Sequence, residues 1–234
     1  MTEAAIKNPE QLLLELPVNE TFAEEDFLLS HSNEEAVKWI DNWPDWQGNH
    51  CLIIYGPNGC GKTHLSHVWQ KISNAQILKL PDLKGNQYTK FENFVFIIED
   101  VMNDLDQFDA QEDLLHLYNW VKEQGGFLLI TARKHPKKWN VGLADLSSRM
   151  MAAGAVKIKH PDDHLLQAII IKQFSDRQVV LTDKVLKYIM KNTERSFAAV
   201  RELVRNIDQI SLSEQKKITI PVVKRAIGDN IDDD

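Results

Sequence analysis

The run Gly56-Pro57-Asn58-Gly59-Cys60-Gly61-Lys62-Thr63 has the residue types and spacing of a phosphate-binding loop. It fits the P-loop pattern G-x-x-x-x-G-K-[ST] and directly follows an apolar run at 51–55, which is the strand–loop–helix setting that the pattern needs. The glycines let successive backbone N–H groups converge on phosphate oxygens, and the helix that begins near Lys62 points the positive end of its dipole at the same anion. The sequence therefore predicts a site for a nucleoside triphosphate or diphosphate.

The side chains around this loop predict how the anion is held. Lys62 is expected to reach the β- and γ-phosphates, and the Thr63 hydroxyl is expected to hold Mg²⁺. In P-loop folds a second strand supplies the carboxylates, and here Glu99 and Asp100 follow the apolar run 94–98. Such a pair can hold Mg²⁺ through one carboxylate and orient a water molecule with the other. The alternative is that both carboxylates only end a strand.

Three more residues are candidates for contact with the nucleotide of this chain or of a neighbour. Thr131 ends the apolar run 127–131 and could touch the γ-phosphate or the attacking water, although a threonine at a strand end often has no such role. Arg149 precedes the last predicted core strand, and Arg201 lies at the start of a late helix. For either arginine, the alternative is a surface salt bridge.

Apolar strands and amphipathic helices alternate through the first two thirds of the chain. The predicted strands are 51–55, 77–80, 94–98, 127–131 and 156–158, and the predicted helices are about 33–43, 62–72 and 110–123, followed by a short helical stretch that contains Arg149. Ser32 and Asn33 are expected to cap the first helix, which Pro44 stops. This alternation predicts an α/β fold with a parallel sheet that is covered on both faces.

The pattern changes to helices alone from Pro161 onward. The predicted helices are about 162–176, 183–192, 196–211 and 220–228, with Thr182 as the cap of the second. Leu165, Ile169 and Phe174 are expected to form the apolar stripe of the first. An α/β core followed by a small helical bundle is the organisation of an AAA+ P-loop NTPase with its lid. We expect a flexible N-terminal segment at 1–24, a nucleotide-binding core at 25–160 and an all-α lid at 161–234.

Composition narrows the class of protein. The chain has 234 residues, 43% of them hydrophobic, and only two cysteines, which do not suggest a disulfide framework, so a reducing cytoplasm is expected. No stretch is apolar enough to span a membrane. The net charge of −7 argues against a protein that grips duplex DNA by itself, although the run 133–138 is locally basic.

The ordered set of motifs resembles the DnaA-like AAA+ family over nearly the whole chain, and in particular its Hda (HdaA) branch, the regulatory inactivators of DnaA. The matching stretches are Phe27-Leu28-Leu29-Ser30-His31-Ser32-Asn33, the P-loop with Thr63-His64-Leu65, Ile98-Glu99-Asp100, Leu146-Ser147-Ser148-Arg149 and Val200-Arg201-Glu202-Leu203. The P-loop alone is shared by many families, whereas the ordered set at these separations is specific.

The resemblance implies roles for individual residues. By it, Arg149 is an arginine finger, Arg201 is the lid arginine (sensor II) and Thr131 lies at sensor I. It also implies ADP or ATP as the nucleotide, with Mg²⁺, and contacts to the nucleotide from Leu28, Leu29 and His64. Implied partners are DnaA and the DNA polymerase III sliding clamp (beta subunit), with DNA reached mainly through the clamp and a homo-oligomer left open.

Two positions depart from the DnaA pattern. Glu99-Asp100 stands where DnaA proteins usually have two aspartates, and Arg133 stands where they commonly have aspartate. Both differences favour a chain that keeps its nucleotide over one that hydrolyses it rapidly.

The N-terminal segment contains a candidate clamp-binding peptide. The run Gln11-Leu12-Leu13-Leu14-Glu15-Leu16 fits the loose pattern Q-x-x-L-x-L, with Gln11, Leu14 and Leu16 as the contact residues, and clamp-binding peptides lie at the N-terminus of Hda-like proteins. The alternative is a disordered tail with stray leucines.

Three functions remain in competition. The first is a regulator that, with the DNA-loaded clamp, promotes hydrolysis of DnaA-bound ATP and so limits replication initiation. The second is a DnaC-like ATPase that loads the replicative helicase, and the third is a non-catalytic adaptor between clamp and DnaA. A metal site at His64 and His67 lacks a clear third ligand, and Trp39, Trp43 and Trp46 are expected to pack in the fold, not to stack on bases.

Overall fold

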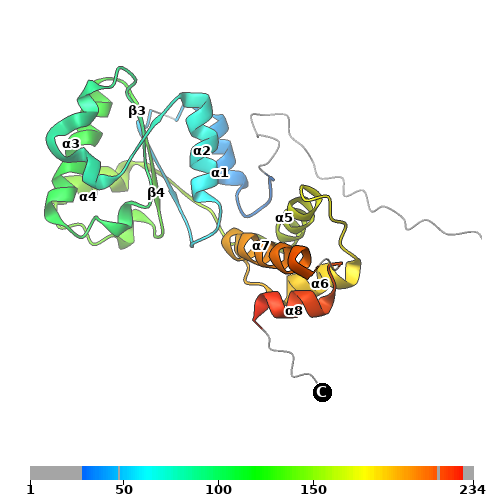
Figure 1. The fold of residues 1–234 in the computed structure, drawn as a ribbon. Helices are drawn as coiled ribbons and strands as arrows, with labels where there is room; N and C mark the ends of the chain where they lie inside the picture. Colours follow the sequence, from blue (N-terminus) through cyan, green and yellow to red (C-terminus); the bar gives the residue numbers. More distant parts are fainter. Residues whose placement is uncertain (1–27, 47, 215–216, 229–234) are drawn as a thin grey trace, which may run out of the picture.

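The computed structural model describes residues 28–46, 48–214 and 217–228, which form an α/β core followed by a group of helices (Figure 1). The division of the sequence into alternating strands and helices, and then helices alone, is therefore confirmed. Among the helices of these residues, none is both long and apolar enough to cross a membrane.

A parallel sheet forms the centre of the core. Within the described residues it has five strands in the order β2-β3-β4-β1-β5. Their bounds are β1 (Cys51–Tyr55), β2 (Gln76–Leu78), β3 (Val95–Ile98), β4 (Phe127–Ala132) and β5 (Gly154–Lys157). Because β1 lies between β4 and β5, the P-loop that follows it leaves from inside the sheet and not from its edge.

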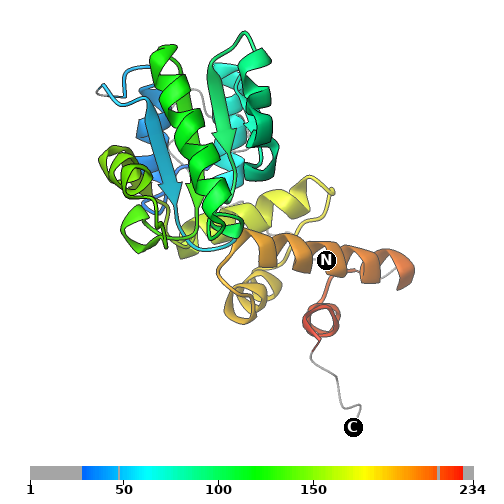
Figure 2. The same ribbon diagram turned by 90° about the vertical axis from the view of Figure 1, so that its left-hand side faces the viewer.

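Helices cover both faces of the sheet, as the two views in Figures 1 and 2 show. One face carries α1 (Glu34–Asp41) and α2 (Lys62–Ser73), and the other carries α3 (Phe108–Glu123) and α4 (Ala144–Ala152). Strands that are buried on both faces have no solvent side, which is why β1 and β3 read as unbroken apolar runs.

Trp43 and Trp46, which were expected to pack in the fold, contact Trp69 of α2. Trp46 is almost fully buried and stacks on Trp69 with ring centroids 5.3 Å apart. Trp43 meets the edge of Trp69 at 6.0 Å, and both Trp43 and Trp46 contact Phe127. The prediction of a packing role is confirmed.

The lid helices have a hydrophobic cluster of their own. They are α5 (Asp163–Ser175), α6 (Asp183–Asn192), α7 (Phe197–Glu214) and α8 (Ile220–Ile227). Of the predicted stripe of α5, Phe174 lies in this cluster and Ile169 packs against it, whereas Leu165 is buried at a cavity toward the core, which Ile169 also lines. Leu166 and Ile170, which were not predicted, also fill the cluster. The helix is apolar around much of its circumference, so the spacing of its apolar residues did not show which of them face the lid cluster and which face the cavity.

The two predicted caps, Asn33 and Thr182, stand at the N-cap positions of their helices, but neither makes a side-chain capping bond. Asn33 is the N-cap residue of α1 but makes no capping bond; its side-chain amide instead donates to the Leu28 carbonyl and accepts from the Ser30 N–H, each at 2.9 Å. Thr182 precedes α6 without a side-chain capping bond. The segment 28–33 is thus held as a compact turn beside the P-loop.

Candidate nucleotide site

The P-loop connects the carboxyl end of β1 to the first turn of α2. Gly59 and Gly61 have φ of +66° and +101°, a region that other residues reach only at about 1–2 kcal/mol. Between them Cys60 is buried, and this burial raises the pKa of its thiol, so the side chain packs under the loop as a neutral group. The loop is therefore shaped by its backbone, as a phosphate cradle requires.

Lys62 is held close to this backbone. Its Nζ donates to the carbonyl oxygens of Gly56 and Pro57, both at 2.9 Å, and the residue is 9% exposed. A buried ammonium group that is bonded to neutral carbonyl oxygens can exchange these bonds for stronger ones to phosphate oxygens.

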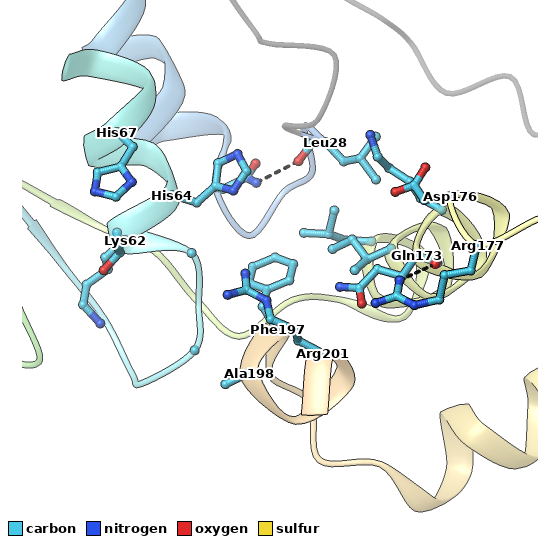
Figure 3. A pocket seen from close by; sticks show the side chains of 17 residues that line it. Leu28, Lys62, His64, His67, Gln173, Asp176, Arg177, Phe197, Ala198 and Arg201 are labelled. Atoms are coloured by element: carbon cyan, nitrogen blue, oxygen red, sulfur yellow. Dashed lines mark hydrogen bonds between the residues drawn. The ribbon is translucent and has the colours of Figure 1, made fainter. Parts of the chain in front are cut away.

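A cavity of about 670 Å³ is lined by residues of the P-loop and of the lid (Figure 3). This volume is in the range of small-molecule sites. The core side is formed by Leu28, Gly59, Gly61, Lys62, Thr63 and His64. The lid side includes Leu165, Ile169, Arg177, Phe197 and Arg201. Apolar walls beside a cationic loop suit a ligand with an apolar and an anionic part.

The charge of the lining is mainly positive. Lys62, Lys172, Arg177 and Arg201 reach the cavity, against the carboxylate of Asp176 among the described lining residues. Of the cations, Arg177 is held by the Gln173 carbonyl at 2.7 Å and by Asp208 at 3.5 Å. Sequence reasoning missed Lys172 and Arg177; Lys172 lies one turn beyond Ile169 on α5, whereas Arg177 lies in the turn after this helix ends.

The lid contacts the P-loop directly at the start of α7. The Phe197 N–H donates to the Gly59 carbonyl at 2.8 Å. A Cβ on Gly59 would lie 2.9 Å from Ser196 Cβ, and one on Gly61 would lie 3.0 Å from the Phe197 ring. The two glycines thus leave room for the lid as well as freedom for the loop, and Figure 3 shows the Phe197 ring beside the cavity.

The Glu99 side chain points toward α2, the helix that contains Thr63. Its Oε1 lies 2.7 Å from Ser66 Oγ, which is also 2.9 Å from the Thr63 carbonyl. Ser66 lies one helical turn after Thr63 on α2, so Glu99 is directed to the helix that carries the Thr63 hydroxyl. A carboxylate and a hydroxyl are among the oxygen donors of a P-loop Mg²⁺ site, in which protein oxygens and phosphates share the ion.

Asp100, unlike Glu99, bonds to residues at the end of β4 and not to α2. Its backbone is left-handed, with φ of +47°, and its N–H donates to the Thr131 hydroxyl at 2.8 Å. Its Oδ2 accepts a hydrogen bond from Arg133 Nη2 at 2.8 Å, and this bond raises the pKa of Arg133. The other oxygen, Oδ1, is buried without a hydrogen-bond partner among the described residues.

Arg149 lies on α4, on the face of the sheet opposite α2. Its Nε is 3.2 Å from Asp145 Oδ1, and its guanidinium lies 5.8 Å from the centre of the Tyr118 ring. The side chain remains 35% exposed. It is absent from the cavity wall, so it can meet a neighbouring molecule but not the P-loop of its own chain.

The predicted site residues thus separate into groups. Leu28, His64 and Arg201 join four P-loop residues at the cavity, namely Gly59, Gly61, Lys62 and Thr63, whereas Gly56, Pro57, Asn58 and Cys60 do not line it. The residues Leu29, Glu99, Asp100, Thr131 and Arg149 do not line it. Gln11, Leu14 and Leu16 lie outside the described residues. Among the described residues no group of three or more His, Cys, Asp or Glu could hold a metal ion, which gives His64 and His67 no third ligand of these types.

Comparisons with known proteins bear on this site. Residues 162–227 match the family model described as the lid domain of Hda. The chromosomal replication initiator protein DnaA of Buchnera aphidicola subsp. Cinara cedri (strain Cc) is 25% identical over 248 residues, covering 93% of this chain. The match covers 55% of the DnaA protein, so the chain spans about half the length of this curated relative.

Solved structures share the fold. Domain III of Thermotoga maritima DnaA has a TM-score of 0.73 at 21% identity, covering 92% of this chain and 99% of that one. AMPPCP-bound DnaA from Aquifex aeolicus has a TM-score of 0.70 at 17% identity, covering 83% of this chain and 67% of that one. A RuvB structure from Thermotoga maritima also matches, with a TM-score of 0.64 at 17% identity, covering 84% and 67%. These likenesses establish the AAA+ fold.

Proposed function

We propose that the chain, whose residues 162–227 match the lid domain of Hda and which is similar to DnaA proteins, is a DnaA-related regulator that binds ADP or ATP with Mg²⁺. The support for nucleotide binding is the cavity at the P-loop, with its positive lining and apolar walls. A bound nucleotide would supply the phosphates that complete the coordination of Mg²⁺.

Within this site each residue has a distinct task. Lys62 binds the phosphates from the loop, and Arg201 binds them from the lid. Thr63 and Glu99 hold the metal ion, and Leu28 with Ile169 covers the apolar part of the ligand. The lid thereby closes on a nucleotide that the core holds, and water is excluded as it does so.

The observation that carries the regulatory function is the position of Arg149 outside its own cavity. A partly exposed guanidinium on α4 suits contact with the nucleotide of a neighbouring AAA+ protein, where it would stabilise the charge that develops on the transferring phosphoryl group. We propose DnaA as that neighbour, with Arg149 promoting hydrolysis of its bound ATP and so limiting re-initiation of replication.

The sliding clamp on DNA is the proposed platform for this contact. The support is the run that contains Gln11, Leu14 and Leu16, which fits a clamp-binding pattern. A peptide of this kind would raise the local concentration of the regulator near DNA without a DNA-binding surface of its own.

A non-catalytic adaptor is the second candidate, and the ion pair between Asp100 and Arg133 favours it over a helicase-loading motor. The two functions differ in one measurement, the rate of hydrolysis of DnaA-bound ATP after this protein is added, with and without clamp loaded on DNA. A clamp-dependent rise in this rate supports the regulator. Binding of clamp and DnaA with no rise supports the adaptor.

A further inference from the structure

Arg133, Asp100 and Asn103 form a closed set of hydrogen bonds at the carboxyl ends of β3 and β4. Arg133 Nη2 donates to Asp100 Oδ2 at 2.8 Å and to Asn103 Oδ1 at 2.9 Å. Asn103 Nδ2 donates to the same Asp100 oxygen at 3.2 Å. Three groups that restrain one another in this way fix the direction of the Asp100 carboxylate.

The backbone adds a further restraint. The left-handed conformation of Asp100 is fixed by the bond from its N–H to Thr131, so the side chain leaves the strand end at a set angle. Its neighbour Glu99 bonds to Ser66 on α2, on the P-loop side, while Asp100 bonds to the loop after β4. The two carboxylates of the acidic pair are thus directed to different partners.

This arrangement bears on hydrolysis. Hydrolysis forms a bond between a water oxygen and the γ-phosphorus, breaks the bond from that phosphorus to the bridging oxygen, and releases ADP and phosphate; the water proton goes to a carboxylate or phosphate oxygen. The Asp100 oxygen that accepts hydrogen bonds from the Arg133 guanidinium and the Asn103 amide is occupied by them, so it is not available to orient an attacking water molecule.

From this geometry we infer that Arg133 is a positioning residue that withholds Asp100 from the chain's own nucleotide, so that the chain keeps its ATP instead of turning it over. The inference rests on the proposed nucleotide site. It gives the acidic pair two tasks: Glu99 holds the metal ion and Asp100 is restrained.

The test is single-turnover hydrolysis of ATP by the purified full chain. Arg133 and Asp100 are 46% and 33% exposed, and an ion pair of this exposure is worth at most about 1 kcal/mol, so Arg133→Ala is expected to hydrolyse ATP about fivefold faster than the parent. Arg133→Lys keeps a cation within reach of Asp100 and is expected to remain near the parent rate. In an Asp100→Asn background, Arg133→Ala is expected to give no increase.

Calorimetry supplies a readout other than activity. The affinities of the parent and of Arg133→Ala for ATP and for ADP, each with Mg²⁺, are expected to agree within about twofold, because Arg133 does not line the cavity. A parent chain that binds no nucleotide would refute the proposed function itself. Binding with no faster hydrolysis in Arg133→Ala, with rates too low to measure in both proteins, or with an equal increase in the Asp100→Asn background would overturn the role of Arg133 alone.

Discussion

The Phe197 N–H donates a hydrogen bond to the Gly59 carbonyl oxygen over 2.8 Å, so lid helix α7 begins against the phosphate-binding loop. Four residues further on, Arg201 faces the cavity that the loop lines. A movement of the loop as it closes on phosphate therefore reaches the lid through one hydrogen bond and one ring contact, without an intervening element.

The first prediction concerns this contact. Gly59→Ala is expected to destabilise the protein by about 2–4 kcal/mol, because it adds a crowded contact with Ser196 to the strain of a positive φ. Urea unfolding measures the change. Gly125→Ala is the matched control, since Gly125 has φ of +69° with no atom within 4 Å of an added Cβ, and about 1–2 kcal/mol is expected there. Equal losses in the two variants would contradict a tight lid contact.

The second prediction concerns the phosphate contact. Lys62→Ala is expected to weaken nucleotide binding by about 2–3 kcal/mol, or roughly 30- to 150-fold, because it removes a charge-assisted hydrogen bond donor from the loop. Isothermal calorimetry measures the affinity. Lys84→Ala changes an exposed lysine away from the cavity and is expected to bind as the parent does. Unchanged affinity in Lys62→Ala would refute the assignment of the site.

The third prediction concerns the lid arginine. Arg201→Ala is expected to lower the affinity for ATP more than tenfold, since the lid then closes without a cation over the phosphates. Arg205→Ala removes an exposed arginine one turn later on α7, outside the cavity wall, and should leave the affinity within about twofold. If both variants lose affinity equally, the effect reflects the net charge of the lid and not a contact of Arg201.

The fourth prediction concerns Arg149. Arg149→Ala is expected to bind its own nucleotide normally but to lose the stimulation of DnaA, because a finger arginine is typically worth ~10³–10⁵ in rate. The readout is hydrolysis of DnaA-bound ATP in the presence of clamp on DNA. Asp145→Ala removes the ion pair of Arg149 while keeping the guanidinium, and it should retain stimulation. Full stimulation by Arg149→Ala would leave the adaptor as the better function.

The fifth prediction concerns the N-terminal peptide. Replacing Gln11, Leu14 and Leu16 together by Ala is expected to remove clamp association and clamp-dependent activity while leaving nucleotide affinity and melting temperature unchanged. A buried leucine anchor is worth several-fold to a hundredfold in affinity at an interface. Size-exclusion chromatography measures the loss as reduced co-elution of the variant with the clamp. A triple variant that still co-elutes at parental affinity would show that clamp binding lies elsewhere.

Strong local signals made the core predictable. Each central strand is an unbroken apolar run, and the P-loop fixes where β1 ends and α2 begins, so β1 was predicted at its observed bounds. The stretch Leu80–Lys90 was not assigned, because its short 3₁₀ turns on both sides of Lys84, Gly85 and Asn86 have no sustained period.

Site residues could be predicted only where a local sequence motif assigns one role to each position. Lys62 and Thr63 follow from the loop pattern itself. Two other contacts join segments that are far apart in the sequence: the backbone hydrogen bond from Phe197 to Gly59, and the ion pair of Arg133 with Asp100. A backbone amide and a surface charge produce no motif or periodicity in the sequence, so neither contact could be predicted. The same holds for Arg177, which lies in the turn after α5 and is held by the Gln173 carbonyl and by Asp208 on α7.

The tryptophans have a consequence for spectroscopy. All six occur at or before Trp139, while the lid has its own hydrophobic cluster, with Tyr188 packed against it, and no tryptophan. Indole emission therefore reports the environment of the core alone, whereas circular dichroism at 222 nm also detects α5 to α8. If the lid melts before the core, the ellipticity at 222 nm falls in an early step that the tryptophan emission does not detect. The difference between the two melting midpoints then reports the stability of the lid relative to that of the core, without any label.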